Sequence, residues 1–307
     1  MGYTRPTTTT RDFLVAAPLP NHGKTYTVIP HKDVIETTKT LLDMSGFTIT
    51  KELYRANMNA RVAQGVYHLN IPNIQKVNGL VASDQDEEMG MMFAWTNSYD
   101  KSTRFQCAVG AFVNVCSNGM LCGDMANYAR KHTGKADHDI HTQLSSQIKS
   151  ANKYYTKLVQ DKNEMRKIFL SKKEQSELVG RLFLDDEIID ASQVSCIKAE
   201  MKDPSYNYNA DLNNAWTFYN HVTHSFKKSH PRTWMSDQVK FHEFMTAELL
   251  SQSGLHQKDK NWVDKDGDGH VVPNLESASV WSRAISGSNF DADMEAQEYD
   301  TFDEFKI

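Results

Sequence analysis

The sequence has few of the features that stabilise secreted or membrane-embedded proteins. Its 307 residues include only four cysteines, and no two of these are spaced as C-x-x-C. A disulfide scaffold of this length would need more, so we expect reduced thiols. No window holds 18 consecutive apolar residues, and the first thirty residues lack the apolar core of a signal peptide. These absences predict a soluble, cytoplasmic protein with no membrane partner.

The familiar catalytic motifs are missing as well. The chain has no H-E-x-x-H pair, Walker loop, nucleophile elbow or dinucleotide fingerprint. The separations between Cys107, Cys116 and Cys122 do not resemble a zinc knuckle. Cys116 precedes a helix expected from about Met120, where a thiol pKa can fall, but no partner base is identifiable. We therefore expect a buried thiol, assign no catalytic residue and no cofactor apart from a structural calcium discussed below, and favour a non-enzymatic protein.

Charge is present but unevenly distributed. Residues 289–307 carry seven carboxylates against one lysine, a local net charge of −6, whereas the whole chain has −5. Residues 149–173 carry eight cations against two carboxylates, a net of +6. An acidic total therefore does not exclude a polyanionic partner. The alternative for the basic stretch is an ordinary solvated helix face.

Patterning along the chain predicts an α+β fold. A Thr- and Pro-containing arm (1–25) precedes a core (26–253), a linker or small subdomain rich in Gly, Asp and Ser (254–288), and an acidic tail (289–307). We expect a mainly antiparallel sheet of about four strands packed with helices, and a flexible C-terminal extension. The four strand candidates are 47–54, 60–69, 88–96 and 104–115.

Helical spacing of apolar residues indicates five helices. Four are expected at 31–45, which Gly46 would end, and at 120–132, 213–228 and 236–252. The fifth is one long helix over about 139–170. Its apolar residues step by three and four, which fits packing on the sheet or pairing with a second subunit, and we favour packing within the fold.

Several strings, in order, resemble a known protein family. They are YTVIPHKDVIETTKTLLDMSGF (26–47), NSYDKSTRF (97–105), VNVCSNGML (113–121), KHTG (131–134) and NNAWTFYNHVTHSFKKSH (213–230). The series resembles the phage- and plasmid-encoded proteins of domain of unknown function 932, over about residues 25–235. The resemblance implies a phage or mobile-element setting and supplies no catalytic residue. The extension after Gly254 is not part of the family pattern.

Cations and aromatic residues alternate on the strand candidates. Such a pattern suits single-stranded DNA, because rings stack on bases while Lys and Arg follow phosphates. We expect residues 97–102 to close a turn by hydrogen-bonding their own backbone. The functional alternative is that Lys101 and Arg104, beside an exposed Tyr99, meet a phosphate backbone at the sheet edge. The candidate nucleic-acid-binding residues are Arg55, Arg61, Tyr99, Lys101, Arg104, Lys149, Lys153 and Lys157.

One local pattern resembles a calcium loop. Asp264, Asp266 and Asp268 occupy positions 1, 3 and 5 of an EF-hand, and His270 occupies position 7. Position 12 is not a carboxylate, so Glu276 would have to close the site one residue late. A structural calcium site and a polar linker with chance resemblance both fit these residues.

Two classes of function fit the sequence. The first is a phage or mobile-element DNA-binding protein, of the single-strand binding or annealing type used in recombination, which would be a homo-oligomer. Its acidic tail would recruit a host or phage protein or compete with DNA for the basic surface. The second is a non-enzymatic interaction protein, either a host-defence inhibitor or a virion-associated component. Salt-dependent affinity for oligonucleotides separates the two classes.

Overall fold

The fold comes from a computed structural model of the chain. It divides into two units, residues 1–255 and 256–307, and each is considered by itself. In the second unit, Val263–Asp264 (β10) and Val271–Val272 (β11) form an antiparallel pair. The structure describes residues 7–21, 27–116, 118–121, 129–130, 136–208, 210–250, 263–264 and 271–272.

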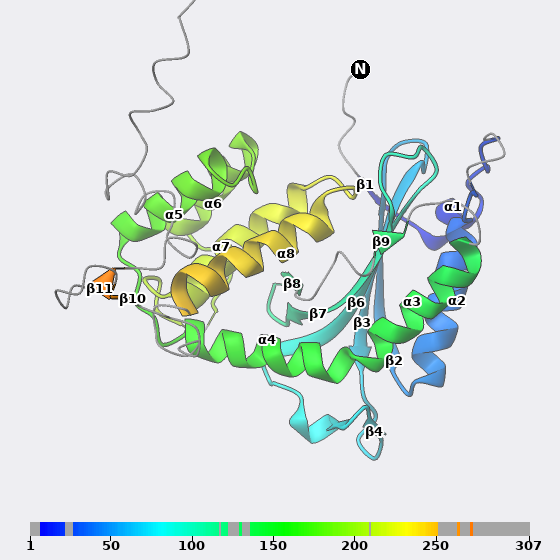
Figure 1. The fold of residues 1–307 in the computed structure, drawn as a ribbon, viewed down its shortest axis with the longest axis horizontal. Helices are drawn as coiled ribbons and strands as arrows, with labels where there is room; N and C mark the ends of the chain where they lie inside the picture. The colour runs from blue at the N-terminus through cyan, green and yellow to red at the C-terminus, as the bar shows by residue number, and fades with distance from the viewer. Residues whose placement is uncertain are drawn as a thin grey trace, which may run out of the picture. The chain divides into compact units, whose positions relative to one another are not determined.

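An antiparallel sheet forms the centre of the first unit (Figure 1). Its strand order is β1-β2-β3-β6-β7-β8, and the short β9 also pairs with β7. The four predicted strands are present, but the count of about four was too low, because the short strands β1 and β8 extend the sheet at its two sides. The strands are Thr7–Thr9 (β1), Thr48–Ala56 (β2), Val62–Asn70 (β3), Met89–Ser98 (β6), Phe105–Val113 (β7), Gly119–Leu121 (β8) and Ala129–Arg130 (β9). Between β3 and β6, Lys76–Val77 (β4) and Leu80–Val81 (β5) form a separate hairpin.

Eight α-helices lie among the described residues. The predicted helices after Pro30, at 213–228 and at 236–252 are confirmed as α2, α7 and α8, and Gly46 follows α2 with a φ of +87°. The helices α5 and α6 were not predicted. The bounds are Arg11–Val15 (α1), His31–Met44 (α2), Ala136–Lys149 (α3), Ala151–Met165 (α4), Lys172–Leu184 (α5), Ala191–Lys202 (α6), Ala215–Ser225 (α7) and Trp234–Met245 (α8).

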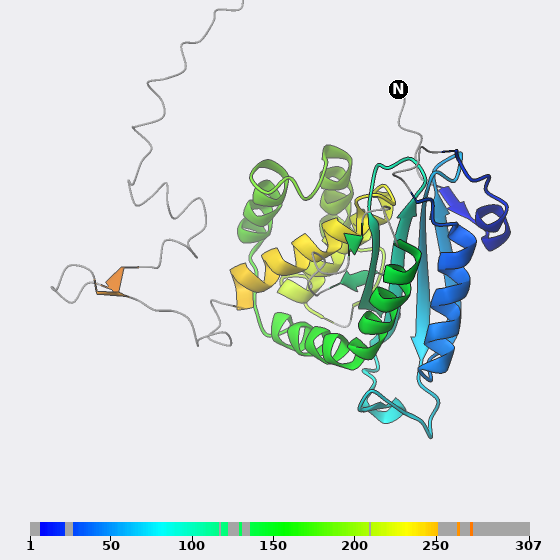
Figure 2. The same ribbon diagram turned by 45° about the vertical axis from the view of Figure 1, so that its right-hand side comes forward.

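The two faces of the sheet pack against different helices. In the register, Leu53 opposes Val66 and Arg55 opposes Gln64, so these side chains share one face. Tyr67 and its cross-strand neighbour Phe93 lie on the other face. Figures 1 and 2 show α7 and α8 on one side of the sheet and α2 and α3 on the other. The sheet is therefore buried on both faces.

Three sequence-based expectations differ from the structure. The long helix predicted over 139–170 is two helices, α3 and α4, which meet at Ser150, so a continuous seam along it does not exist. Gly119–Leu121 is a strand, not the start of a helix, because it completes a ladder with β7. The N-terminal arm contains β1 and α1, whose Leu14 is fully buried. Within the described residues, no helix is long and apolar enough to span a membrane.

Candidate nucleic-acid interface

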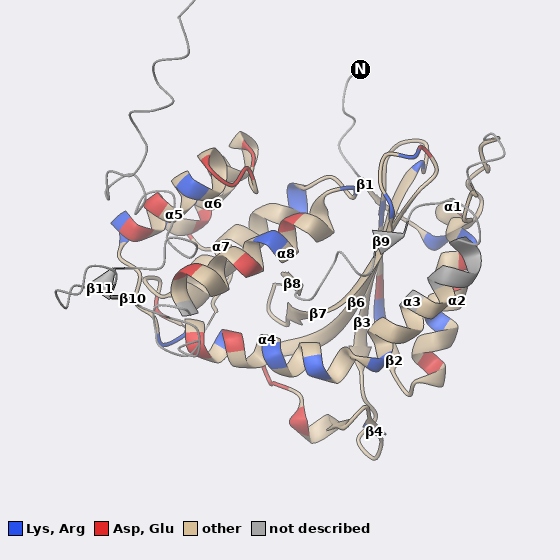
Figure 3. Cartoon of the chain, in the orientation of Figure 1, with Lys and Arg blue, Asp and Glu red and all other residues tan. Residues whose placement is uncertain are grey.

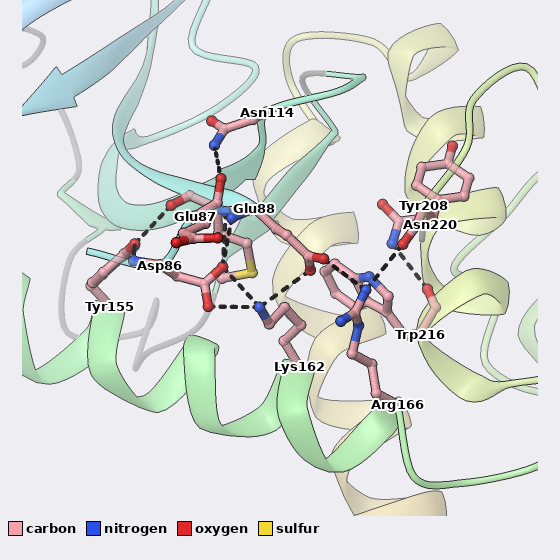
Figure 4. Close-up of polar contacts among 11 residues, drawn as sticks. Asp86, Glu87, Glu88, Asn114, Tyr155, Lys162, Arg166, Tyr208, Trp216 and Asn220 are labelled. Atoms are coloured by element: carbon pink, nitrogen blue, oxygen red, sulfur yellow. Dashed lines mark hydrogen bonds and ion pairs between the residues drawn. The ribbon is translucent and has the colours of Figure 1, made fainter. Parts of the chain in front are cut away.

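Half of the cations in the basic stretch, residues 149–173, form ion pairs within the chain. These four of eight are Lys157, Lys162, Arg166 and Lys167. Lys162, which is 3% exposed, places its Nζ atom 2.6 Å from Asp86 Oδ2 and 3.4 Å from Glu88 Oε2. Arg166 Nη2 lies 2.8 Å from Glu88 Oε1 (Figure 4). These two cations therefore join α4 to the segment before β6. Their charges are therefore not available to bind a partner.

The three cations of this stretch that were predicted to bind nucleic acid divide into two kinds. Lys157 Nζ lies 2.7 Å from Asp161 Oδ2, and that carboxylate also pairs with the buried His242 at 3.1 Å. Lys149 and Lys153 are exposed, at the end of α3 and the start of α4. Figure 3 accordingly shows both charge colours along α4. The net charge of the stretch overstates the free positive charge that the helix carries.

Tyr99 is buried, in contrast to the expectation. It is 2% exposed, its ring stacks on His31 with the centroids 3.9 Å apart, and its hydroxyl accepts a hydrogen bond from the His31 amide at 2.7 Å. Burial raises the pKa of this phenol. Tyr54 and Tyr67 are buried as well, joined by a 3.3 Å hydrogen bond between their hydroxyls. The strand aromatics thus stabilise the core, and we find no stacking platform in these three rings.

The turn at residues 97–102 has the structural role that its sequence suggested. Asp100 accepts a hydrogen bond from the Ser102 amide at 3.0 Å, which closes the turn. Asn97 is fully buried and donates to Ile29 O at 2.9 Å. Lys101 is exposed at the tip with a φ of +64°. The hydrogen bonds of Asp100 and Asn97 therefore stabilise the turn, and Lys101 and Arg104 are exposed on it.

Several predicted cations do come together, at one end of the sheet. The turn at 57–61 joins β2 to β3, and the turn at 99–104 joins β6 to β7 at the same end, as the amide of Tyr99 donates to Arg61 O. The segment after α7 also lies against this end of the sheet. Thr96 Oγ1 donates to Pro231 O at 3.3 Å, and Arg55 Nη2 donates to Lys227 O at 3.1 Å. We define this region as the cationic end, formed by Arg55, Arg61, Arg104, Lys227, Lys228 and Arg232.

The charge of the cationic end is not matched by ion pairs. Its six residues are exposed or half-buried, and none is in an ion pair with a described carboxylate. Burial lowers the pKa of Arg55 to about 10, so the guanidinium stays charged at neutral pH. Figure 3 shows blue segments at the end of the sheet beside β1 and β9. The carboxylates nearest to these cations along the chain are Glu52, which pairs with Lys39, and Asp100 in the 99–104 turn.

A cavity of about 300 Å³ adjoins the cationic end. It lies between the sheet face that carries Arg55 and Gln64 and the helices α7 and α8. Its described lining contains no Asp or Glu. The lining residues are Thr8, Leu53, Tyr54, Arg55, Gln64, Val66, His68, Met92, Gly119, Thr223, Lys227, Trp234 and Gln238.

Sequence reasoning missed how two of the quoted strings meet beside this cavity. Asn118, before β8, donates to Asn220 O of α7 at 3.0 Å, and Lys227 Nζ donates to Cys116 O at 2.8 Å. Cys116 is 5% exposed, and burial raises its pKa, so it is a buried thiol and not an activated nucleophile. The polar residues Asn220 and His221, which directly follow Phe218 and Tyr219, were the feature that could have indicated this contact.

The predicted calcium loop falls mostly outside the described residues. Asp264 is the second residue of β10, paired with Val271. Asp266, Asp268, His270 and Glu276 lie outside the part of the chain that the structure describes. The calcium site stays a prediction from sequence.

Fold and site together define an α+β protein with a sheet covered on both faces and a cationic end beside an internal cavity. The family model of a domain of unknown function, DUF932, matches residues 18–260. Because this is most of the chain, the protein belongs to that family, as the ordered strings predicted. No curated protein and no solved structure matches the chain.

Proposed function

We propose that the protein is a phage or mobile-element protein that binds single-stranded DNA through its cationic end, as annealing proteins of recombination do. The observation that carries this proposal is the convergence of unpaired cations from three segments that are far apart in the sequence. Arg61, Arg104 and Arg232 come from a strand turn, a second strand turn and the segment before α8. A surface that concentrates positive charge in this way suits a polymer of phosphates.

The alternative, a non-enzymatic interaction protein acting on a host-defence complex or in a virion, uses the same surface for an acidic protein partner. The two proposals differ in their dependence on nucleic acid. A DNA-binding protein releases counterions from the strand, so its affinity falls steeply with salt. An annealing protein is also expected to form homo-oligomers.

The first test is the double variant Arg61→Gln, Arg104→Gln. Both side chains are exposed and outside the described ion pairs, so the variant should fold normally. We expect its affinity for a labelled single-stranded oligonucleotide at low salt to fall about tenfold, and the salt slope to fall by about 1.4, roughly 0.7 for each lost phosphate contact. Filter binding at several salt concentrations measures both quantities.

The matched control is Lys149→Gln, Lys153→Gln, which removes the same charge from the α3–α4 corner. We expect a smaller loss, because Asn78 Nδ2 donates to Ile148 O at 2.9 Å. This contact places the α3–α4 corner beside the β4–β5 hairpin, at the end of the sheet opposite the cationic end. Equal binding by the parent chain and the Arg61, Arg104 variant would contradict the proposed interface. No binding by the parent chain at any salt concentration would favour the interaction protein.

A further inference from the structure

The cavity beside the cationic end contains polar groups that lack partners. Gln64 on β3 and Gln238 on α8 are 1% and 0% exposed. Gln64 Oε1 and both polar atoms of the Gln238 carboxamide have no hydrogen-bond partner in the described structure. Both side chains line the cavity. Buried amide groups are almost always hydrogen-bonded, so these two indicate a ligand that supplies the missing partners.

The chemistry of the two amides restricts that ligand. A carboxamide presents a donor next to an acceptor, and its complement is another edge on which donor and acceptor alternate. Nucleobases have such edges, and Gln pairs with them in protein–DNA complexes. A purely apolar ligand or a simple anion would leave most of these amide atoms unpaired.

The walls of the cavity suit a flat apolar ring. Leu53, Val66 and Met92 line the sheet side, and Trp234 lines the helix side. Gly119 keeps the space between them open, because a Cβ atom there would lie 3.0 Å from Met92 Cε and 3.2 Å from Trp234 Cζ2. Indole and thioether surfaces are favourable neighbours for a base.

The positive charges in the cavity lining favour an anionic ligand. Arg55 and Lys227 both line the cavity, and the hydrogen bonds found for them are donated to backbone carbonyls or, for Lys227, shared with His224. With no Asp or Glu in the described lining, nothing there offsets their charge. A phosphate is the group that this pair would favour.

We propose that this cavity binds one nucleotide, with its base between the carboxamides of Gln64 and Gln238 and its phosphate toward Arg55 and Lys227. The ligand is either a free mononucleotide or an unstacked nucleotide of a bound strand. The second source rests on the proposed function, because it requires single-stranded DNA at the adjoining cationic end.

The test compares the full chain with the variants Gln238→Leu and Gln64→Leu. Leucine removes the amide while filling similar space. Because Gln64 Oε1 and both amide atoms of Gln238 have no partner in the described structure, the folded state should not be destabilised. Thermal unfolding checks this. Calorimetry then uses three kinds of probe: the four deoxynucleoside 5′-monophosphates, 2-deoxyribose 5-phosphate without a base, and a single-stranded oligonucleotide. The variant Lys76→Gln serves as a surface control, because this exposed lysine lies in the β4–β5 hairpin, at the end of the sheet opposite the cationic end.

We expect saturable binding of at least one mononucleotide or of the oligonucleotide by the parent chain, weakened tenfold or more in each Leu variant and unchanged in Lys76→Gln. 2-Deoxyribose 5-phosphate should bind much more weakly than a mononucleotide. Equal binding of the base-free sugar phosphate, or oligonucleotide binding that neither Leu substitution changes, would overturn the nucleotide site and leave the proposed function standing. Mononucleotide binding without oligonucleotide binding would support the site and overturn the proposed function. No binding of any probe would overturn both.

Discussion

At the scale of single residues, His68 shows how burial fixes a charge state. Its ring stacks on Phe112 with the centroids 3.6 Å apart and is 5% exposed. Burial, with a smaller contribution from the nearby charge of Lys51, lowers the pKa of His68 to about 4. The imidazole is therefore neutral at physiological pH, and the cavity that it lines gains no positive charge from it.

This pKa predicts a pH dependence of stability. An unfolded histidine takes up a proton below pH 6.5, whereas folded His68 does so only near pH 4, so the unfolded state gains stability as the pH falls between these values. At pH 5 the difference is about 2 kcal/mol of unfolding free energy. We expect His68→Gln to lose less stability between pH 7 and pH 5 than the parent chain, as measured by urea unfolding. Parallel pH curves for the two proteins would contradict the assignment.

At the scale of elements, the docking of α4 depends on a buried ion pair. Lys162 Nζ donates to both Asp86 carboxylate oxygens, at 2.8 and 2.6 Å, and Tyr155 of the same helix donates to Met89 O at 2.8 Å (Figure 4). These contacts join the helix to the start of β6. The basic composition of residues 149–173 therefore reflects packing as much as surface charge.

Removing this lysine should be costly. In Lys162→Ala, Asp86 and Glu88 lose the buried cation that compensates them, and we expect the unfolding free energy to fall by about 3 kcal/mol. The matched control is Lys167→Ala on the segment after α4, since Lys167 is 68% exposed and pairs with Glu164 only at the surface. That change should cost less than about 0.5 kcal/mol. Urea unfolding of both variants makes the comparison, and similar losses would show that the ion pair does not stabilise the docking.

Predictions for elements succeeded where the signal was local. The helix after Pro30 and the four long strands follow from periodicity within each segment. Met120 and Leu121 of β8 were predicted as the start of a helix because so short a segment carries no strand pattern, and its ladder with β7 is a long-range contact. The break between α3 and α4 was missed because apolar spacing continues across Ser150.

At the scale of the whole molecule, the acidic tail should compete with DNA. Residues 289–307 have a net charge of −6, opposite in sign to the cationic end. A chain ending at Ser288 should bind single-stranded oligonucleotide several-fold more tightly at low salt, with the difference disappearing as salt screens the tail. Filter binding measures both. A full-length chain whose seven tail carboxylates are replaced by amides should match the shortened chain, and a shortened chain that binds no more tightly would contradict tail competition.

The sequence alone determined the α+β class, the main strands, the family and the uneven distribution of charge along the chain, because these depend on local composition and order. Only the tertiary structure decided which cations are available. In the sequence, Lys162 and Arg166 belong to a basic stretch. In the structure they pair with Asp86 and Glu88, more than seventy positions earlier. Arg55, Gln64 and Gln238 meet at one cavity through strand register and helix packing. Such meetings depend on long-range contacts, and no local pattern specifies them.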